Sequence, residues 1–159
     1  MRRIIPGFAW CMMKIEILPL EARFVPGAAG LEKECLSTAW SEKQLRDLPD
    51  YAVYLVALCG ETVCGTGCLY CIGDEAELQN LAVAPANRRQ GIGEVLLGAL
   101  SEEARGRGCV AVFLEVASRN EPAKRLYESF GYAEKEIISG KMPGNERFRV
   151  KVYGLCRDT

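Results

Sequence analysis

Hydrophobic residues in the first half of this chain alternate or run in short stretches between glycine-containing turns, which is the pattern of β-strands. Four strands are predicted, at residues 14–18, 51–58, 62–72 and 75–83. Gly60-Glu61 and Gly73-Asp74 separate the last three, which indicates antiparallel hairpins. Two short helical patterns lie between the first and second strands, around residues 30–37 and 41–48, and Ser41 is predicted as the N-cap of the second.

The spacing becomes helical at Gly91. Apolar residues then recur four positions apart along one face, namely Ile92, Leu96, Leu100 and Ala104. Gly106 and Gly108 are predicted to end this helix. Residues 109–116 are nearly all apolar, as expected of a strand that is covered on both faces.

A last helix and two strands complete the pattern. The helix is predicted to start at Asn120 as N-cap, with Pro122 in its first turn, and to stop at Gly131. Its inward stripe consists of Ala123, Leu126, Tyr127 and Phe130. Residues 134–139 and 147–155 predict the last two strands.

Residues 78–116 read as a strand, a glycine-rich turn, a long helix and a second strand, so these two strands should be parallel neighbours. The hairpins around them make the sheet mixed. We therefore predict an α/β fold of the α+β kind, with a central sheet of about seven strands flanked by about four helices.

Length and composition favour one globular domain. The chain has 159 residues, of which 49% are hydrophobic and 26% charged, enough for a buried core. A formal net charge of −1 gives no overall positive field, so direct nucleic-acid and membrane partners are not expected. Met12 and Met13 immediately precede the first predicted strand, and we interpret residues 1–12 as an N-terminal extension and residues 13–159 as the domain.

Cysteine and histidine usage narrows the chemistry. Eight cysteines without a credible secretory signal favour reduced thiols and a cytoplasmic protein. Because the chain has no histidine, Ser-His and Cys-His nucleophile pairs and histidine metal sites are excluded. Cys64, Cys68 and Cys71 have the spacing of a radical iron–sulfur motif, but they fall within one predicted strand, where Cys64 and Cys68 should face opposite to Cys71. We expect structural thiols and no metal.

A candidate anion site lies between the fourth strand and the long helix. Its residues are Arg88, Arg89, Gln90, Gly91, Ile92, Gly93 and Glu94. Free amides and the dipole at the start of a helix suit a diphosphate, the glycines allow close approach, and the arginines add positive charge. The same glycines could instead serve only a turn that needs positive φ.

The spacing Arg88-x-x-Gly91-x-Gly93 after the strand LQNLAV resembles the acetyl-CoA signature of the GNAT superfamily. Residues 75–132, which include FLEV and LYESFGY, are most similar to bacterial ribosomal-protein-alanine N-acetyltransferases. The resemblance implies a GNAT fold splayed between the fourth and fifth strands. It also implies that amides of residues 90–94 bind the pyrophosphate of acetyl-CoA.

The same resemblance implies further cofactor contacts. The pantetheine arm would lie along Leu81, Ala82 and Val83, with the backbones of Leu81 and Val83 pairing with it as if it were an added strand. Asn120 would lie near the other end of the cofactor.

Two side chains are candidates for acid–base chemistry. Glu115 is a carboxylate within an apolar strand, where burial would raise its pKa and improve it as a base, unless it only forms a salt bridge at the strand end. Tyr127 could be a core residue, but a phenol could also return a proton to the CoA sulfur. The resemblance to the GNAT superfamily implies that Glu115 is the general base and that Tyr127 is the general acid.

The implied reaction is acetyl transfer to an amine, most simply the N-terminal alanine of a small-subunit ribosomal protein. Another N-terminus, a lysine or a small amine is the first alternative, and a non-catalytic acetyl-CoA-binding module is the second. After Tyr132 the resemblance weakens: residues 138–143 read ISGKMP where an arginine-rich, tyrosine-containing stretch is usual. The acceptor peptide is expected to contact this region.

Overall fold

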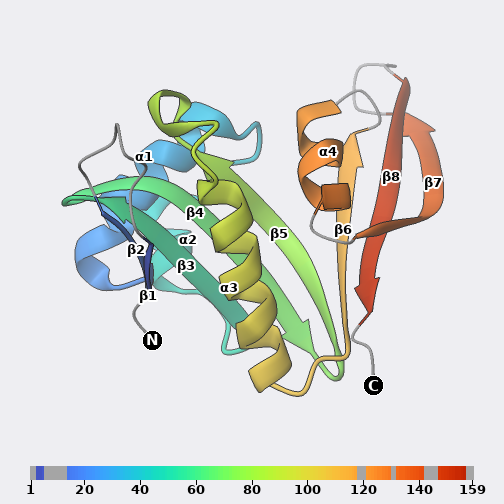
Figure 1. Ribbon diagram of the computed structural model, residues 1–159, viewed down its shortest axis with the longest axis horizontal. Helices are drawn as coiled ribbons and strands as arrows, with labels where there is room; N and C mark the ends of the chain where they lie inside the picture. The colour runs from blue at the N-terminus through green and yellow to red at the C-terminus, as the bar shows by residue number, and fades with distance from the viewer. Residues whose placement is uncertain (1–2, 6–13, 118–120, 130–131, 142–146, 157–159) are drawn as a thin grey trace.

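The computed structural model describes residues 3–5, 14–117, 121–129, 132–141 and 147–156. In these residues an eight-stranded mixed sheet carries helices on both faces (Figure 1). The strands are β1 (Arg3–Ile5), β2 (Ile15–Pro19), β3 (Ala52–Cys59), β4 (Thr62–Ile72), β5 (Glu75–Val83), β6 (Ala111–Ala117), β7 (Ala133–Lys141) and β8 (Arg147–Cys156). The helices are α1 (Val25–Cys35), α2 (Glu42–Arg46), α3 (Ile92–Gly106) and α4 (Glu121–Ser129), with single 3-10 turns at Ala22–Phe24 and Pro85–Asn87.

The strand order is β1-β2-β3-β4-β5-β6-β8-β7. Every neighbouring pair is antiparallel except β5 and β6, which are parallel as predicted for the strands on either side of α3. The eighth strand, beyond the expected seven, is β1, which pairs with β2 through residues inside segment 1–12.

The first helix starts earlier than predicted. It begins at Val25, not near residue 30, and has Pro26 in its first turn, where a missing N–H and a fixed φ are tolerated. The residues that follow are small, and a Cβ built on Gly27 would lie 3.0 Å from Val63 Cγ2. Small residues packed tightly on the sheet therefore concealed the helical stripe from a hydrophobic pattern.

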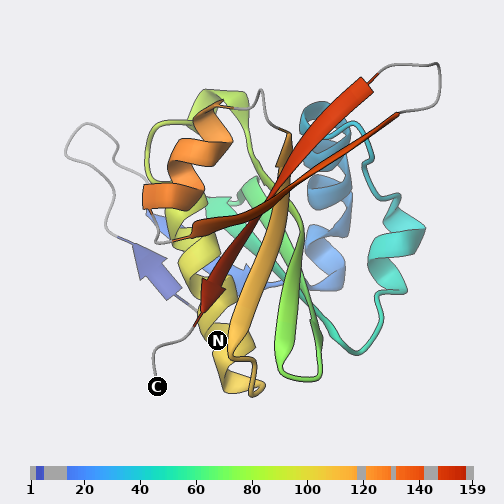
Figure 2. The same ribbon diagram turned by 90° about the vertical axis from the view of Figure 1, so that its right-hand side faces the viewer.

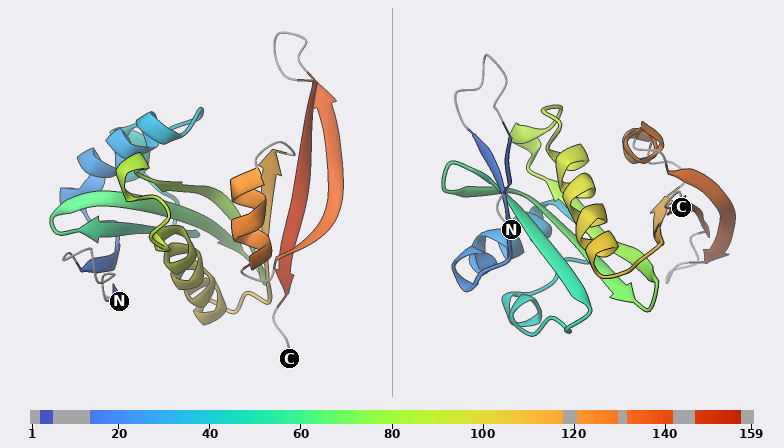
Figure 3. Two further views of the ribbon diagram at one scale, coloured as in Figure 1. Left: turned by 45° about the horizontal axis from the view of Figure 1, so that its top comes forward. Right: turned by 60° about the horizontal axis from the view of Figure 1, so that its bottom comes forward.

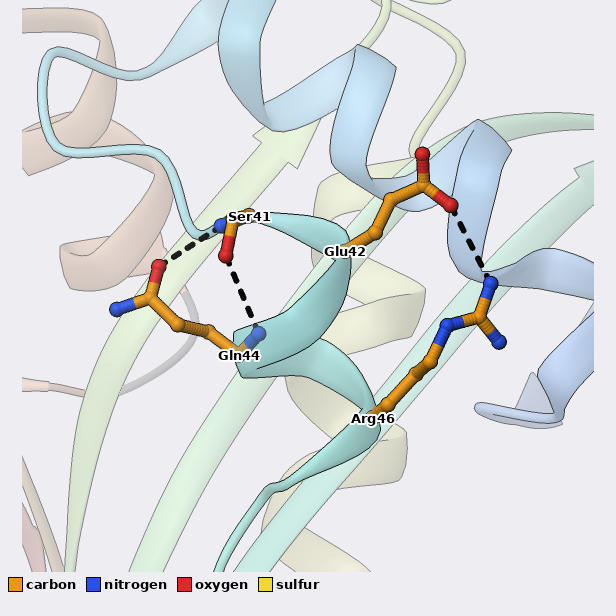
Figure 4. Close-up of polar contacts among 4 residues, drawn as sticks. All are labelled: Ser41, Glu42, Gln44 and Arg46. Carbon is orange, nitrogen blue, oxygen red and sulfur yellow. Dashed lines mark hydrogen bonds and ion pairs between the residues drawn. The ribbon is translucent and has the colours of Figure 1, made fainter.

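The second helix carries the predicted cap (Figure 4). Gln44 N–H donates to Ser41 Oγ at 3.2 Å, and Ser41 N–H donates to Gln44 Oε1 at 2.8 Å. Arg46 pairs with Glu42 at 3.3 Å one turn away. This reciprocal capping box fixes the start of a helix that is only five residues long.

Helices α1 and α2 cover one face of the sheet, and α3 and α4 cover the other (Figure 2). Successive residues of β3 supply both cores: Val53 and Leu55 pack with α3, whereas Tyr54 and Val56 pack with α1 and α2. Helix α3 lies close to the sheet at Gly67 of β4, which has no side chain. A Cβ at Gly67 would be only 2.7 Å from Leu100 Cδ1. The predicted stripe of α3 is buried throughout.

Strands β5 and β6 separate shortly after they start. They pair only from Glu75 with Ala111 to Glu77 with Phe113. Beyond this point the strands diverge toward their carboxyl ends (Figures 1 and 3). The predicted splay between the two strands that flank α3 is thus confirmed, and it leaves one edge of β5 without a neighbouring strand.

None of the helices in the described part of the chain combines the length and the hydrophobicity that crossing a bilayer requires.

Candidate functional site

The N-terminus of α3 presents backbone amides that no side chain caps. Its N-cap is Gly91, which makes no side-chain cap bond, and the first bond of the helix runs from Val95 N–H to Gly91 O at 3.1 Å. The amides of Ile92, Gly93 and Glu94 therefore have no partner within the helix. Together with the helix dipole they form the anion-binding arrangement that the glycine spacing predicted.

The loop before α3 holds two residues in the left-handed region. Arg89 has φ 65°, and Gly91 has φ 80° and ψ 8°. A non-glycine residue rarely adopts such a φ, and its cost is of the order of 1–2 kcal/mol. The left-handed conformation of Gly91 supplies the turn at which the loop enters α3.

A cavity of about 860 Å³ lies in front of these amides. Helix α3 and its loop contribute Arg88, Arg89, Gly91, Ile92, Gly93 and Glu94. Strand β5 contributes Leu81, Ala82 and Val83, α1 contributes Cys35, and α4 contributes Ala123 and Leu126. The structure thus brings nearly all the predicted cofactor residues to one place. Gln90 is half-buried and is not part of the lining, and Asn120 lies outside the described residues.

Gly93 allows α4 to approach this cavity. A Cβ at this position would lie 3.3 Å from Leu126 Cδ2 of α4 and 3.8 Å from Val83 Cγ2 of β5. Any side chain here would push against α4 and would also stand among the free amides. The second glycine of the motif therefore has a packing role, whereas the first supplies the left-handed turn.

The backbone of β5 directs hydrogen-bonding groups into the splay. Ala84 N–H donates to Cys64 O of β4 at 2.8 Å, and Val83 is the Cα partner of Gly65. Because backbone groups alternate along an antiparallel strand, those of Ala82 face β4, whereas those of Leu81 and Val83 face the opposite, open edge. This is the edge at which an extended ligand could add as a strand.

One group on this edge is already engaged. Arg88 Nε donates to Val83 O at 3.1 Å, and the Cys35 thiol lies 3.7 Å from the same oxygen. The Arg88 guanidinium also approaches Cys35 Sγ at 3.8 Å. Arg88 therefore fixes the loop to the end of β5, and its charge lies at the cavity that the neighbouring amides face.

Glu115 was predicted to be buried, and this prediction is wrong. Its side chain is exposed, and its neighbour across the ladder is Val152 of β8. The prediction assumed that an apolar strand would be covered on both faces along its whole length, but β6 leaves β5 after Phe113. Glu115 therefore borders the open splay, and the burial that was predicted for it is absent.

Tyr127 is buried on the inner face of α4, as the helical pattern predicted. Its ring lies 6.0 Å from that of Tyr132 at an angle of 57°. Burial raises the pKa of Tyr127 to about 12, so the phenol keeps its proton over the physiological range. Its α4 neighbours Ala123 and Leu126 line the cavity, whereas Tyr127 and Glu115 do not.

A buried carboxylate that the sequence did not single out lies on the other face of the sheet, beneath α1 and α2. Glu32 of α1 is fully buried, accepts a hydrogen bond from Trp40 N–H at 3.0 Å and accepts another from the Tyr54 hydroxyl. Burial and the neighbouring Glu32 carboxylate raise the pKa of Tyr54. Glu32 thus ties the segment after α1 to strand β3. A charged residue on an otherwise apolar helical face was the available signal.

The three cysteines of the iron–sulfur-like spacing do not lie as predicted. Cys64 packs in the core beneath α3, whereas Cys68 packs beneath α1 and α2, so the prediction that they share a face is wrong. The reason is a β-bulge in the β3–β4 ladder near Ala57 and Leu58, which breaks strict alternation. Burial raises the pKa of the Cys68 thiol to about 12. Within the described ranges, no three cysteine or acidic side chains are grouped as a metal would need.

The sequence matches the Acetyltransferase (GNAT) family over residues 25–132, more than half of the chain. A [ribosomal protein bS18]-alanine N-acetyltransferase from Escherichia coli K12 is 34% identical over 129 residues, which cover 80% of this chain and 86% of that protein. A protein of the same description from Haemophilus ducreyi is 41% identical over 84 residues, 52% of this chain and 58% of that protein.

Solved structures agree. The ribosomal-protein-S18-alanine N-acetyltransferase from Escherichia coli superposes with a TM-score of 0.80 and 28% identity, covering 91% of this chain and 95% of that one. Arabidopsis thaliana NAA60 in complex with a bisubstrate analogue gives a TM-score of 0.79 at 16% identity, with 91% and 98% covered, and so shares the fold. The family match, these relatives and the observed splay together establish that this chain is an acyltransferase of the GNAT acetyltransferase family.

Proposed function

We propose that this protein transfers the acetyl group of acetyl-CoA to the α-amine of an N-terminal alanine, and that the acceptor is a small-subunit ribosomal protein. The observation that supports cosubstrate binding most strongly is the uncapped N-terminus of α3, which faces a cavity continuous with the open edge of β5. The acceptor is proposed from the relatives, whose name describes this acceptor, at 34% identity over most of both chains.

The proposed cosubstrate site divides by chemistry. The amides of residues 90–94 and the guanidinium groups of Arg88 and Arg89 bind the diphosphate. The backbone groups of Leu81 and Val83 that face the open edge of β5 form hydrogen bonds with the amides of the pantetheine arm, and Ala82 lies between these two residues. Asn120 completes the site near the other end. Engagement of the Val83 carbonyl by Arg88 implies that this guanidinium moves when the arm binds.

The proposed reaction is direct attack. As the acceptor nitrogen bonds to the thioester carbon, Glu115 takes up a proton from the nitrogen, and the carbon–sulfur bond breaks. Tyr127 donates its hydroxyl proton to the departing sulfur, which leaves as the thiol of CoA, and the phenolate regains a proton from solvent. An α-amine with pKa ~8 must give up its proton at about 1.4 kcal/mol at pH 7, against about 4.6 for lysine. This difference favours an N-terminal acceptor.

The environment of Tyr127 defines its part in this reaction. Moving a proton from a phenol with pKa about 12 to a thiolate with pKa ~8.5 costs roughly 4–5 kcal/mol. The phenol therefore acts chiefly as a hydrogen-bond donor to sulfur while charge develops, and the proton passes over late.

Tyr127→Phe is expected to lower kcat by about tenfold to a hundredfold, because the departing sulfur loses this hydrogen bond and its late proton donor, while the ring still packs in the core. The dissociation constant of acetyl-CoA should stay unchanged. In the wild type, kcat/KM should show no alkaline fall up to about pH 10, because the raised pKa keeps the phenol protonated. Steady-state kinetics across this range check both statements. Unaltered kcat in Tyr127→Phe would mean that Tyr127 is a core residue only.

Release of CoA thiol with a panel of acceptors tests the proposed function. The panel contains the N-terminal peptide of ribosomal protein bS18, the same peptide with a blocked α-amine, a peptide whose only free amine is a lysine, and small amines. Turnover that requires the free α-amine of alanine supports the proposal. Turnover with lysine or small amines alone would replace the acceptor, and tight binding of acetyl-CoA without turnover would indicate a non-catalytic module.

A further inference from the structure

Strand β5 contains an extra residue where it leaves β6. Cys68 of β4 is the partner of Asn80, but the next residue, Leu69, is the partner of Leu78, so Gln79 has no partner. The pairing of β5 with β6 ends at Glu77. The bulge therefore lies at the point where the two strands separate, and a bulge at such a point redirects the side chains that follow.

The register shows which way Asn80 is redirected. Glu77 pairs with Tyr70, whose ring stacks on Trp40, so Glu77 lies on the face covered by α1 and α2. Strict alternation from Glu77 would turn Asn80 to the α3 face. The extra residue instead makes Asn80 the partner of Cys68, which packs under α1 and α2.

Glu115 lies on the same face. Phe113 is the partner of Glu77, and Glu115 follows two residues later on β6, so both point to the side of α1 and α2. Asn80 and Glu115 thus stand on opposite sides of the splay and share one face. Tyr127 comes from α4 on the other face, where Leu126 meets Gly93 at the start of α3.

The Asn80 side chain offers an acceptor that the residues described by the structure do not use. Its Oδ1 is buried, and no hydrogen-bond donor in the described part of the chain reaches it. A buried acceptor of this kind costs free energy in the folded protein, and native structures keep few of them without a purpose. The lining of the cosubstrate cavity begins at Leu81 and does not include Asn80. The acceptor substrate, and not the cosubstrate, is therefore the simpler source of a hydrogen-bond donor for Asn80.

We propose that Asn80 Oδ1 accepts a hydrogen bond from the acceptor amine. This inference rests on the proposed function. Glu115 takes one proton of the amine from one side of the splay, and Asn80 holds a second N–H from the other side, which orients the nitrogen lone pair toward the thioester. The amine class that fits is a primary amine, whose neutral form has two N–H bonds, one for Glu115 and one for Asn80, as the N-terminal alanine has.

Substitution by leucine, which has nearly the same shape, tests the role. In Asn80→Leu, kcat/KM for the alanine peptide should fall about tenfold or more, while the dissociation constant of acetyl-CoA stays unchanged. The melting temperature should not fall, because an unused buried acceptor has been removed. Asn80→Asp keeps an oxygen acceptor and should recover most of the lost kcat/KM. Gln79→Leu removes the neighbouring amide as a matched control and should behave as the wild type.

The outcomes separate this role from the proposed function. Wild-type turnover together with unaltered kinetics in Asn80→Leu would overturn the Asn80 assignment alone. Asn80→Leu could also lose activity because its melting temperature falls. If so, and if Asn80→Asp does not recover kcat/KM, the role of Asn80 is structural and the assignment is overturned. Tight acetyl-CoA binding without turnover of any acceptor by the wild type would overturn the proposed function, and this assignment with it.

Discussion

Glu115→Gln is expected to lower kcat by about 10²–10⁴-fold, since a positioned general base contributes this much. Glutamine keeps the shape of the side chain but cannot take up the amine proton. The side chain is exposed, so the exchange should leave the melting temperature unchanged. Calorimetry should give the wild-type dissociation constant for acetyl-CoA, because the cosubstrate cavity lies along α3 and β5.

Glu75→Gln is the matched control for this experiment. Glu75 is an exposed carboxylate on the same face, but it lies at the closed end of the splay, where β5 still pairs with β6 at Ala111. Wild-type kcat is expected for Glu75→Gln. If Glu115→Gln also turned over at the wild-type rate, the base would have to be another group or a water molecule.

Glu32→Ala is expected to lower the free energy of unfolding by about 3–5 kcal/mol. The change leaves the Tyr54 hydroxyl and Trp40 N–H without their acceptor inside the protein and also creates a cavity. For a domain of this size, the melting temperature should fall by roughly 6–20 °C. Denaturant titration and thermal melting measure both quantities.

Glu32→Gln separates the hydrogen bonds from the charge. Glutamine has the same shape and can still accept from Trp40 N–H, so its loss of stability should be well below that of Glu32→Ala. Tyr54→Phe removes one donor and should be intermediate. A Glu32→Ala protein as stable as the wild type would show that the buried carboxylate is not what holds the segment after α1 to β3.

Much of the fold could be predicted from residue patterns, because α3 and the hairpins bury regular stripes. The start of α1 could not, since Gly27 and Ala28 pack by their small size and not by hydrophobicity. The face of Cys64 and the direction of Asn80 depend on bulges, and a bulge moves later side chains to the opposite face without any mark in the hydrophobic pattern.

The candidate site was predicted best where its groups are local in sequence. The turn at Gly91 and the amides that follow belong to one short segment, and the structure has them as expected. The environment of Glu115 was not predictable in this way. It depends on how far β6 remains beside β5, a contact between strands that a 15-residue helix separates. The Glu32 network likewise joins residues from α1, the following segment and β3.

Calorimetric titration of the full chain with acetyl-CoA shows whether the amides at the start of α3 bind the diphosphate. We expect saturable binding at one site, which acetyl-pantetheine, lacking the diphosphate, does not reproduce at the same concentrations. No measurable binding of acetyl-CoA, or equally tight binding of acetyl-pantetheine, would contradict it.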